Sequence, residues 1–150
     1  MTTIHHLLAP LALLLACHGA LAQAPQPAAA AAYDGRWSVT LVCDDVKERD
    51  AFVKGYDFQF PAEIAGGQLK GQYGSRGAPG SMALTGTVAP DGTLELRAEG
   101  ISGKSEHTFG RMAQGSPYRY TMQGKLEGNT GSARRRELRA CTASFARQPS

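Results

Sequence analysis

Residues that carry catalysis or bind metal ions are scarce in this chain. Beyond residue 22, His107 is the only histidine, and the chain contains no G-x-S-x-G, H-E-x-x-H or S-x-x-K motif. A serine–histidine–aspartate arrangement would depend on His107 alone, and spacing singles out no pair of carboxylates. The two cysteines beyond residue 22 have no nearby histidine at the spacing that zinc requires. We predict that the protein is not an enzyme and holds neither a metal nor another cofactor.

The sequence also lacks long apolar runs and a strong excess of one charge. The formal net charge is +3, which does not by itself predict a nucleic-acid partner. The apolar run at residues 7–16 is too short to span a bilayer as a helix, and no longer run follows it. Because Ala20-Leu21-Ala22 matches a small-x-small cleavage pattern, residues 1–22 are predicted to be a signal peptide. The mature protein is then expected in the periplasm or outside the cell.

The residues before the folded part allow a second processing route. Leu14-Leu15-Ala16-Cys17 resembles a bacterial lipobox, so the alternative is a protein anchored to lipid through Cys17. Residues 23–32, rich in alanine and proline, have almost nothing to bury and predict a flexible linker. The remaining residues, 33–150, are enough for one domain.

Cysteines are few, and their number predicts a crosslink. Removal of the leader removes Cys17 and leaves Cys43 and Cys141, a pair in an oxidising compartment. We expect a disulfide between them, and two free buried thiols are the alternative.

The sequence has many short stretches in which apolar and polar residues alternate. Trp37, Val39, Leu41 and Cys43 alternate with more polar residues, as in a strand with one buried face. Similar segments lie at residues 56–60, 69–73, 82–88, 94–98, 107–112 and 118–126, with a last strand within 136–147. Pro61 is expected to end the second strand, or residues 62–65 extend it past a bend, and residues 44–54 and 75–80 are expected to be exposed loops. Eight such strands predict an all-β fold: a small antiparallel up-and-down barrel closed by one disulfide, or alternatively a β-sandwich.

The first strand opens with Gly35-Arg36-Trp37, a G-x-W that resembles the start of calycin barrels such as lipocalins, avidins and bacterial protease inhibitors. The resemblance implies that Trp37 plugs one end of the barrel and that an arginine near the last strand packs across it. The candidates are Arg134, Arg135, Arg136 and Arg139, of which Arg136 and Arg139 are the expected closure residues. The wider pattern D-G-x-W-x-V is similar to small secreted proteins common in proteobacterial genomes. That likeness supports export and fold but implies no activity.

Two groups of residues are candidates for binding. The inward-facing aromatic residues either fill the core or face a ligand: Tyr56, Phe58, Tyr73, Tyr118 and Tyr120. The run Arg134-Arg135-Arg136 is either an exposed turn or a contact for anions, such as lipopolysaccharide phosphates or an acidic protein surface.

The function expected first is a non-catalytic binding module that acts on another envelope protein, such as a hydrolase, as barrel inhibitors do. Residues 44–54 and 75–80 would make the contacts. The alternatives are a small-ligand carrier with a hollow barrel and a structural accessory domain of the envelope. The protein-binding hypothesis predicts a filled core, whereas the carrier hypothesis predicts an apolar cavity. Packing of Phe58 against Tyr120 would exclude the carrier.

Overall fold

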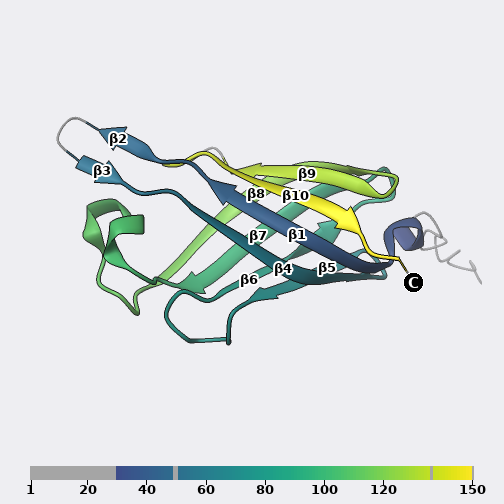
Figure 1. The fold of residues 1–150 in the computed structure, drawn as a ribbon. Helices are drawn as coiled ribbons and strands as arrows, with labels where there is room; N and C mark the ends of the chain where they lie inside the picture. Colours follow the sequence, from purple (N-terminus) through teal and green to yellow (C-terminus); the bar gives the residue numbers. More distant parts are fainter. Residues whose placement is uncertain (1–29, 49–50, 136, 150) are drawn as a thin grey trace, which may run out of the picture.

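The computed structural model describes residues 30–48, 51–135 and 137–149 (Figure 1). The predicted signal peptide, Cys17 and residues 23–29 of the predicted linker lie outside the described residues. The described part begins with the 3₁₀ turn η1 (Ala30–Tyr33), which includes the last three residues of that linker. Within the described residues, no helix is long and apolar enough to cross a membrane.

Eight strands form one closed antiparallel barrel in which each strand pairs with the next in sequence and the last pairs with the first. The barrel strands are β1 (Gly35–Cys43), β4 (Tyr56–Ala65), β5 (Gln68–Tyr73), β6 (Met82–Val88), β7 (Thr93–Ile101), β8 (Pro117–Glu127), β9 (Thr130–Arg135) and β10 (Cys141–Arg147). Two short strands, β2 (Val46–Glu48) and β3 (Ala51–Val53), pair with each other between β1 and β4. The predicted up-and-down barrel is confirmed, and the sandwich alternative is wrong.

The barrel closes where β1 lies between β4 and β10. Cys43 and Cys141 face each other in the β1–β10 register, and a disulfide joins them with their Cα atoms 4.0 Å apart. The predicted crosslink is therefore confirmed. It connects residues 98 positions apart, a separation for which the chain-entropy model gives about 4–5 kcal/mol of stabilisation.

Alternating side chains fill the interior of the barrel. On β1 the inward positions Trp37, Val39 and Leu41 are at most 1% exposed, as a strand with one buried face requires. The neighbouring strands contribute apolar residues that are likewise almost fully buried: Ile64, Leu69, Met82, Leu84, Leu94, Leu96, Met122, Leu126 and Phe145.

One predicted strand is wrong, and one barrel strand was not predicted. Residues 107–112 do not form a barrel strand, because they contain part of the 3₁₀ turn η2 (Ser105–His107) and all of η3 (Phe109–Arg111). Gly110 and Arg111 have φ values of +62° and +50°, which a β-strand does not allow. The eighth strand is instead β9, which the sequence hid because its inward positions are Gly131 and Ala133. A Cβ at Gly131 would lie 2.6 Å from the Leu126 side chain, so only a small residue fits.

Two further expectations are refined by the structure. Pro61 does not end β4, which continues to Ala65, so the alternative of an extension over residues 62–65 holds. Since β4 pairs with β5 only over residues 62–65, Pro61 lies just beyond that pairing, where a missing N–H is tolerated. Residues 44–54 are not simply a loop, because they contain the β2–β3 hairpin.

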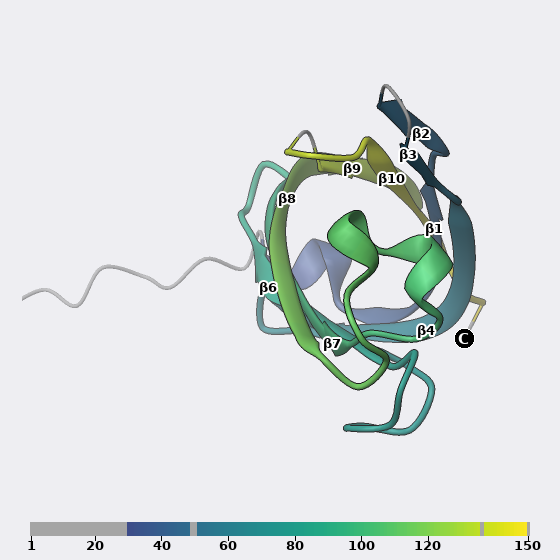
Figure 2. The ribbon, with the colours of Figure 1, turned by 90° about the vertical axis from the view of Figure 1, so that its left-hand side faces the viewer.

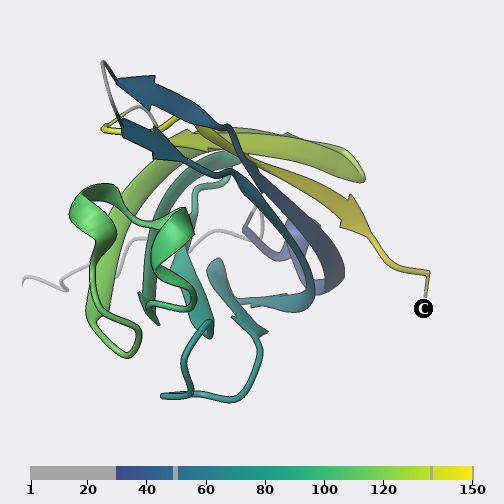
Figure 3. The ribbon, with the colours of Figure 1, turned by 60° about the vertical axis from the view of Figure 1, so that its left-hand side comes forward.

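The two ends of the barrel carry different additions. At one end, which we call the closed end, η1 and the chain terminus lie beside the start of β1 (Figure 1). At the other end, the mouth, β1 continues into the projecting β2–β3 hairpin, and η2 and η3 lie in front of the opening (Figures 2 and 3). The disulfide is on the mouth side, at the end of β1 and the start of β10.

Candidate functional site

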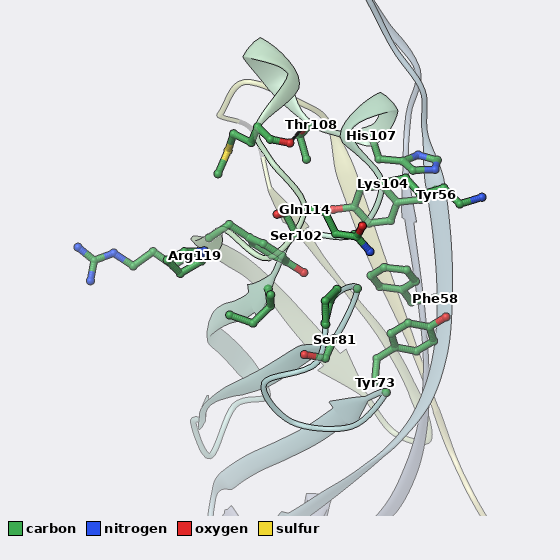
Figure 4. Close-up of a pocket in the computed structure, with 18 of the residues that line it drawn as sticks. Tyr56, Phe58, Tyr73, Ser81, Ser102, Lys104, His107, Thr108, Gln114 and Arg119 are labelled. Carbon is green, nitrogen blue, oxygen red and sulfur yellow. Dashed lines mark hydrogen bonds between the residues drawn. The ribbon is translucent and has the colours of Figure 1, made fainter.

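The mouth contains a cavity of about 960 Å³. Its walls come from the mouth ends of β4, β5 and β8, the loop at residues 74–81 and the residues that connect β7 to β8. Figure 4 shows that Phe58 and Tyr73 lie side by side on one wall, with Ser81 below and His107 above. The barrel is therefore filled toward the closed end and hollow at the mouth.

Aromatic rings form much of the cavity wall. The rings of Phe58 and Tyr73 are stacked with centroids 4.0 Å apart, and Tyr56 lies 4.8 Å from Phe58. On the β8 side, the Tyr118 and Tyr120 rings are nearly parallel at 6.1 Å. Among the described residues, Phe58 and Tyr120 are not a contacting ring pair, so the packing that would exclude a carrier does not occur. All five predicted ligand-facing aromatics line this one cavity.

The tyrosines of β8 are neutral polar groups in the wall. Burial raises the pKa of Tyr118 and of Tyr120 far above the usual tyrosine value, and the nearby Arg135 offsets this only in part. The hydroxyl of Tyr120 points to the sulfur of Met82, 3.6 Å away. The wall is therefore apolar in its rings and uncharged at its hydroxyls at neutral pH.

Residues 102–116 form a roof segment over the mouth. Ser102 anchors its base: this buried hydroxyl donates to the carbonyl of Ala113 at 2.7 Å and accepts from the N–H of Ser116 at 2.9 Å. His107 sits edge-on to the Tyr56 ring, and its Nδ1 lies 3.1 Å from the carbonyl of Lys54. The roof segment thus contacts the barrel wall on the β4 side and is tied at its own base.

The guanidinium groups of two arginines pack on tyrosine rings at the cavity wall. The guanidinium carbon of Arg135 lies 4.2 Å from the Tyr120 ring centre, and that of Arg139 lies 5.2 Å from the Tyr56 ring centre. Arg139 also lies 5.5 Å from the ring of Phe109, which belongs to the roof segment. Arg139 is 3% exposed, and its Nε, Nη1 and Nη2 atoms have no hydrogen-bond partner within the part of the chain that the structure describes.

The arginine that packs on Trp37 is Arg147. Its guanidinium carbon lies 5.6 Å from the Trp37 ring, and its Nη2 donates to the carbonyl of Asp34. In the β1–β10 register Arg147 is the direct partner of Trp37, whereas Arg139 precedes β10 at the mouth. The predicted contact between Arg139 and Trp37 is therefore wrong, because it assumed the wrong end of the last strand. The other expected closure residue, Arg136, lies outside the described residues.

The predicted arginine run is not one exposed turn. Arg134 and Arg135 are the last two residues of β9 and so point to opposite faces. Arg134 is exposed on the outside, whereas the side chain of Arg135 is 13% exposed and lines the cavity. The loop at residues 75–80, predicted to contact a partner protein, contributes Ser75, Ala78, Pro79 and Gly80 to the cavity wall, and its contact with a partner stays a prediction.

Sequence reasoning did not identify the roof segment or Arg147. For Arg147 a signal existed, since the last inward-facing position of the closing strand must lie beside the first residues of the opening strand. The roof segment has no such signal. Among the described residues, no group of three or more histidine, cysteine, aspartate or glutamate side chains could hold a metal ion.

Comparisons with protein-family models, curated proteins and solved structures find no match for this chain. The resemblance of Gly35-Arg36-Trp37 to calycin barrels therefore stays a prediction.

Proposed function

We propose that this chain is an exported, non-catalytic binding barrel that carries a small, largely apolar ligand in the mouth cavity. The observation that supports this most is the cavity itself, because about 960 Å³ lies near the upper end of the range for ligand pockets. Stacked rings line it, as is typical of pockets that bind flat or hydrocarbon groups. The order of the hypotheses thus changes: the carrier, an alternative from the sequence, now comes first.

Export rests on the predicted signal peptide and is supported by the disulfide, since such bonds persist mainly in oxidising compartments. Mapping the mature N-terminus tests it. A terminus at Gln23 supports cleavage after the small-x-small pattern, and a lipidated Cys17 supports the anchored form. An uncleaved chain that stays in the cytoplasm contradicts export.

The binding role is tested with an uncharged fluorescent probe, N-phenyl-1-naphthylamine, titrated into the purified protein. We expect saturable binding at one site. The substitution Ala78→Trp places a large ring into the cavity from the loop at residues 74–81 and should weaken binding about tenfold or more, equivalent to about 1.4 kcal/mol. The matched control is Ala65→Trp, at an exposed position at the closed end. Absence of saturable binding, or equal effects of both variants, contradicts the proposal.

A second candidate, binding to another envelope protein, is favoured by the β2–β3 hairpin. This hairpin projects beyond the mouth (Figure 1), and the ring of Phe52 on it is 54% exposed. A partner captured from envelope extract by the wild type but not by Phe52→Asp would support this role. Capture that is the same with both proteins would contradict a role of the hairpin.

A further inference from the structure

The cavity has a one-sided charge. Among the described residues that line it, Lys104, Arg119, Arg135 and Arg139 are basic, and none is an aspartate or a glutamate. Arg119 points its guanidinium group away from the cavity (Figure 4). Lys104 is exposed at the rim. The two arginines on β9 and before β10 are therefore the cations of the inner wall.

Arg139 is held in an unfavourable state as the structure stands. A guanidinium group has five N–H donors, and burying them without acceptors costs free energy. The faces of Tyr56 and Phe109 attract its charge, but ring faces do not replace hydrogen-bond acceptors. Burial lowers the pKa of Arg139 and the neighbouring Arg135 lowers it further, whereas Tyr56 and Asp45 act in the opposite direction.

The nearest carboxylates do not satisfy this pair of cations. One oxygen of Asp45 accepts a hydrogen bond from the N–H of Gly55 at 2.6 Å, and among the described residues Asp45 forms no hydrogen bond with the Arg139 guanidinium. Glu137 lies 4.0 Å from Nε of Arg135, but its side chain is 63% exposed, so water weakens that attraction. The tyrosines of β8 stay neutral and cannot supply a negative charge. Two arginines therefore lie in one wall with no buried anion among the described residues.

We propose that the ligand of the mouth cavity carries an acidic group, a carboxylate or a phosphate, that binds Arg139 and Arg135 while its apolar part lies on the aromatic wall. This proposal rests on the proposed carrier function. A carboxylate or phosphate offers the oxygen pair that a guanidinium binds in bidentate fashion. Because Arg139 is covered, a side chain must move as the acid enters. Phe109 is the covering ring that belongs to the roof segment rather than to a barrel strand, so we assign this movement to Phe109.

The test uses three ligands that share a naphthalene ring and differ in charge: 2-naphthoate, 2-naphthyl phosphate and the uncharged 2-naphthylmethanol. Each is titrated into the protein by calorimetry. We expect at least one of the two anions to bind the wild type about tenfold or more tightly than the alcohol, the size of a hydrogen bond to a charged group. In Arg139→Gln this ratio should fall severalfold, because only Arg135 then remains to bind the acid, while the alcohol binds as before. Arg134→Gln is the matched control, since it removes an equal charge from the outer face of the same wall.

The outcomes separate the two proposals. If none of the three ligands binds the wild type, the carrier function fails, and the acidic-group proposal fails with it. If all bind with equal affinity, or if Arg134→Gln lowers the ratio as much as Arg139→Gln, only the acidic-group proposal is overturned. A preference for naphthoate or for naphthyl phosphate that Arg139→Gln lowers and Arg134→Gln does not supports the proposal and identifies which acid the cavity binds.

Discussion

Along β4, the inward side chains become more buried from the mouth to the closed end. Tyr56 and Phe58 are half-buried, whereas Phe60 is 4% exposed and Ile64 is 1% exposed. β8 repeats this gradient from Tyr118 to the fully buried Leu126. The same strands thus build a packed core at one end and an open aromatic chamber at the other.

Polar groups differ between the two ends in the same way. At the closed end, the indole N–H of Trp37 donates to the carbonyl of Tyr33 at 2.9 Å, and Arg147 donates to the carbonyl of Asp34. At the mouth, Arg139 is more deeply buried than Arg147, but it has no acceptor within the described chain. Apart from the disulfide at the mouth, the buried polar groups of the closed end therefore stabilise the barrel, whereas Arg139 at the mouth does not.

The test of this contrast with the largest expected effect removes one aromatic ring from each end of the barrel. Trp37→Ala deletes a fully buried side chain and should lower the free energy of unfolding by about 3–5 kcal/mol. Phe58→Ala deletes a half-buried ring at the cavity and should cost only about 1–2 kcal/mol. Urea unfolding followed by circular dichroism measures both. Equal losses would mean that the mouth is as important for stability as the closed end.

A second test compares the two arginines. Arg147→Met removes a guanidinium that packs on Trp37 and donates to a carbonyl, so we expect a loss of about 2 kcal/mol. Arg139→Met removes a buried charge without acceptors and should instead raise the free energy of unfolding by about 1 kcal/mol. Changes of opposite sign in the free energy of unfolding, measured with urea, support the contrast between the two ends. A clear loss of stability in Arg139→Met would show that its packing between Tyr56 and Phe109 is structural.

The closed end is also the part that the sequence predicted well. Trp37, Val39 and Leu41 occupy one face of a strand, and period-two alternation predicts their burial because successive side chains point to opposite faces. At the mouth, the cysteine pair predicted the crosslink for a chemical reason that does not depend on the fold. In both cases the signal lies in residue types whose environment is strongly restricted.

The mouth was harder to predict because its features depend on contacts distant in sequence. The aromatic residues of β4 and β8 were identified, but alternation does not tell whether rings fill a barrel or surround a cavity. β9 was missed since Gly131 and Ala133 carry no strand signal, and at Gly131 the close approach of Lys125 and Leu126 on the neighbouring strand leaves no room for a Cβ. The contact with Trp37 was assigned to Arg139 and is made by Arg147, because an arginine near the last strand can lie before that strand or at its end.

The buried tyrosines of the mouth predict a specific dependence on pH. Burial raises the pKa of Tyr118 and Tyr120 above the ordinary value of about 10, so the unfolded chain loses these protons at lower pH than the folded chain does. Their contribution to stability is complete below pH 10 and is lost as the pH rises beyond it. We expect the free energy of unfolding to fall by about 1–2 kcal/mol between pH 10 and 11. The double substitution Tyr118→Phe and Tyr120→Phe should flatten this fall, and an unchanged slope would contradict it.

The smallest expected effect concerns the backbone next to Arg139. Leu138 has a φ of +59° and is 72% exposed, so it adopts a left-handed conformation that costs a leucine about 1 kcal/mol and gains little from burial in return. Leu138→Asn should relieve this cost, because asparagine accepts that conformation, and should raise the free energy of unfolding by up to about 1 kcal/mol. The matched control is Leu126→Asn, in the packed core at the closed end, which should be strongly destabilised.

If Leu138→Asn also leaves naphthalene ligands bound as tightly as in the wild type, the strain is incidental to binding. If it stabilises the protein but weakens the preference for the acidic ligand, the strained turn helps to hold Arg139 against the cavity wall. Stability would then be lost at the mouth in two neighbouring residues: by backbone strain in Leu138, and in Arg139 by a buried charge that has no acceptor in the described part of the chain. At the closed end, the contact of Arg147 with Trp37 stabilises the barrel. A loss of stability in Leu138→Asn would contradict the strain and remove this residue from the comparison.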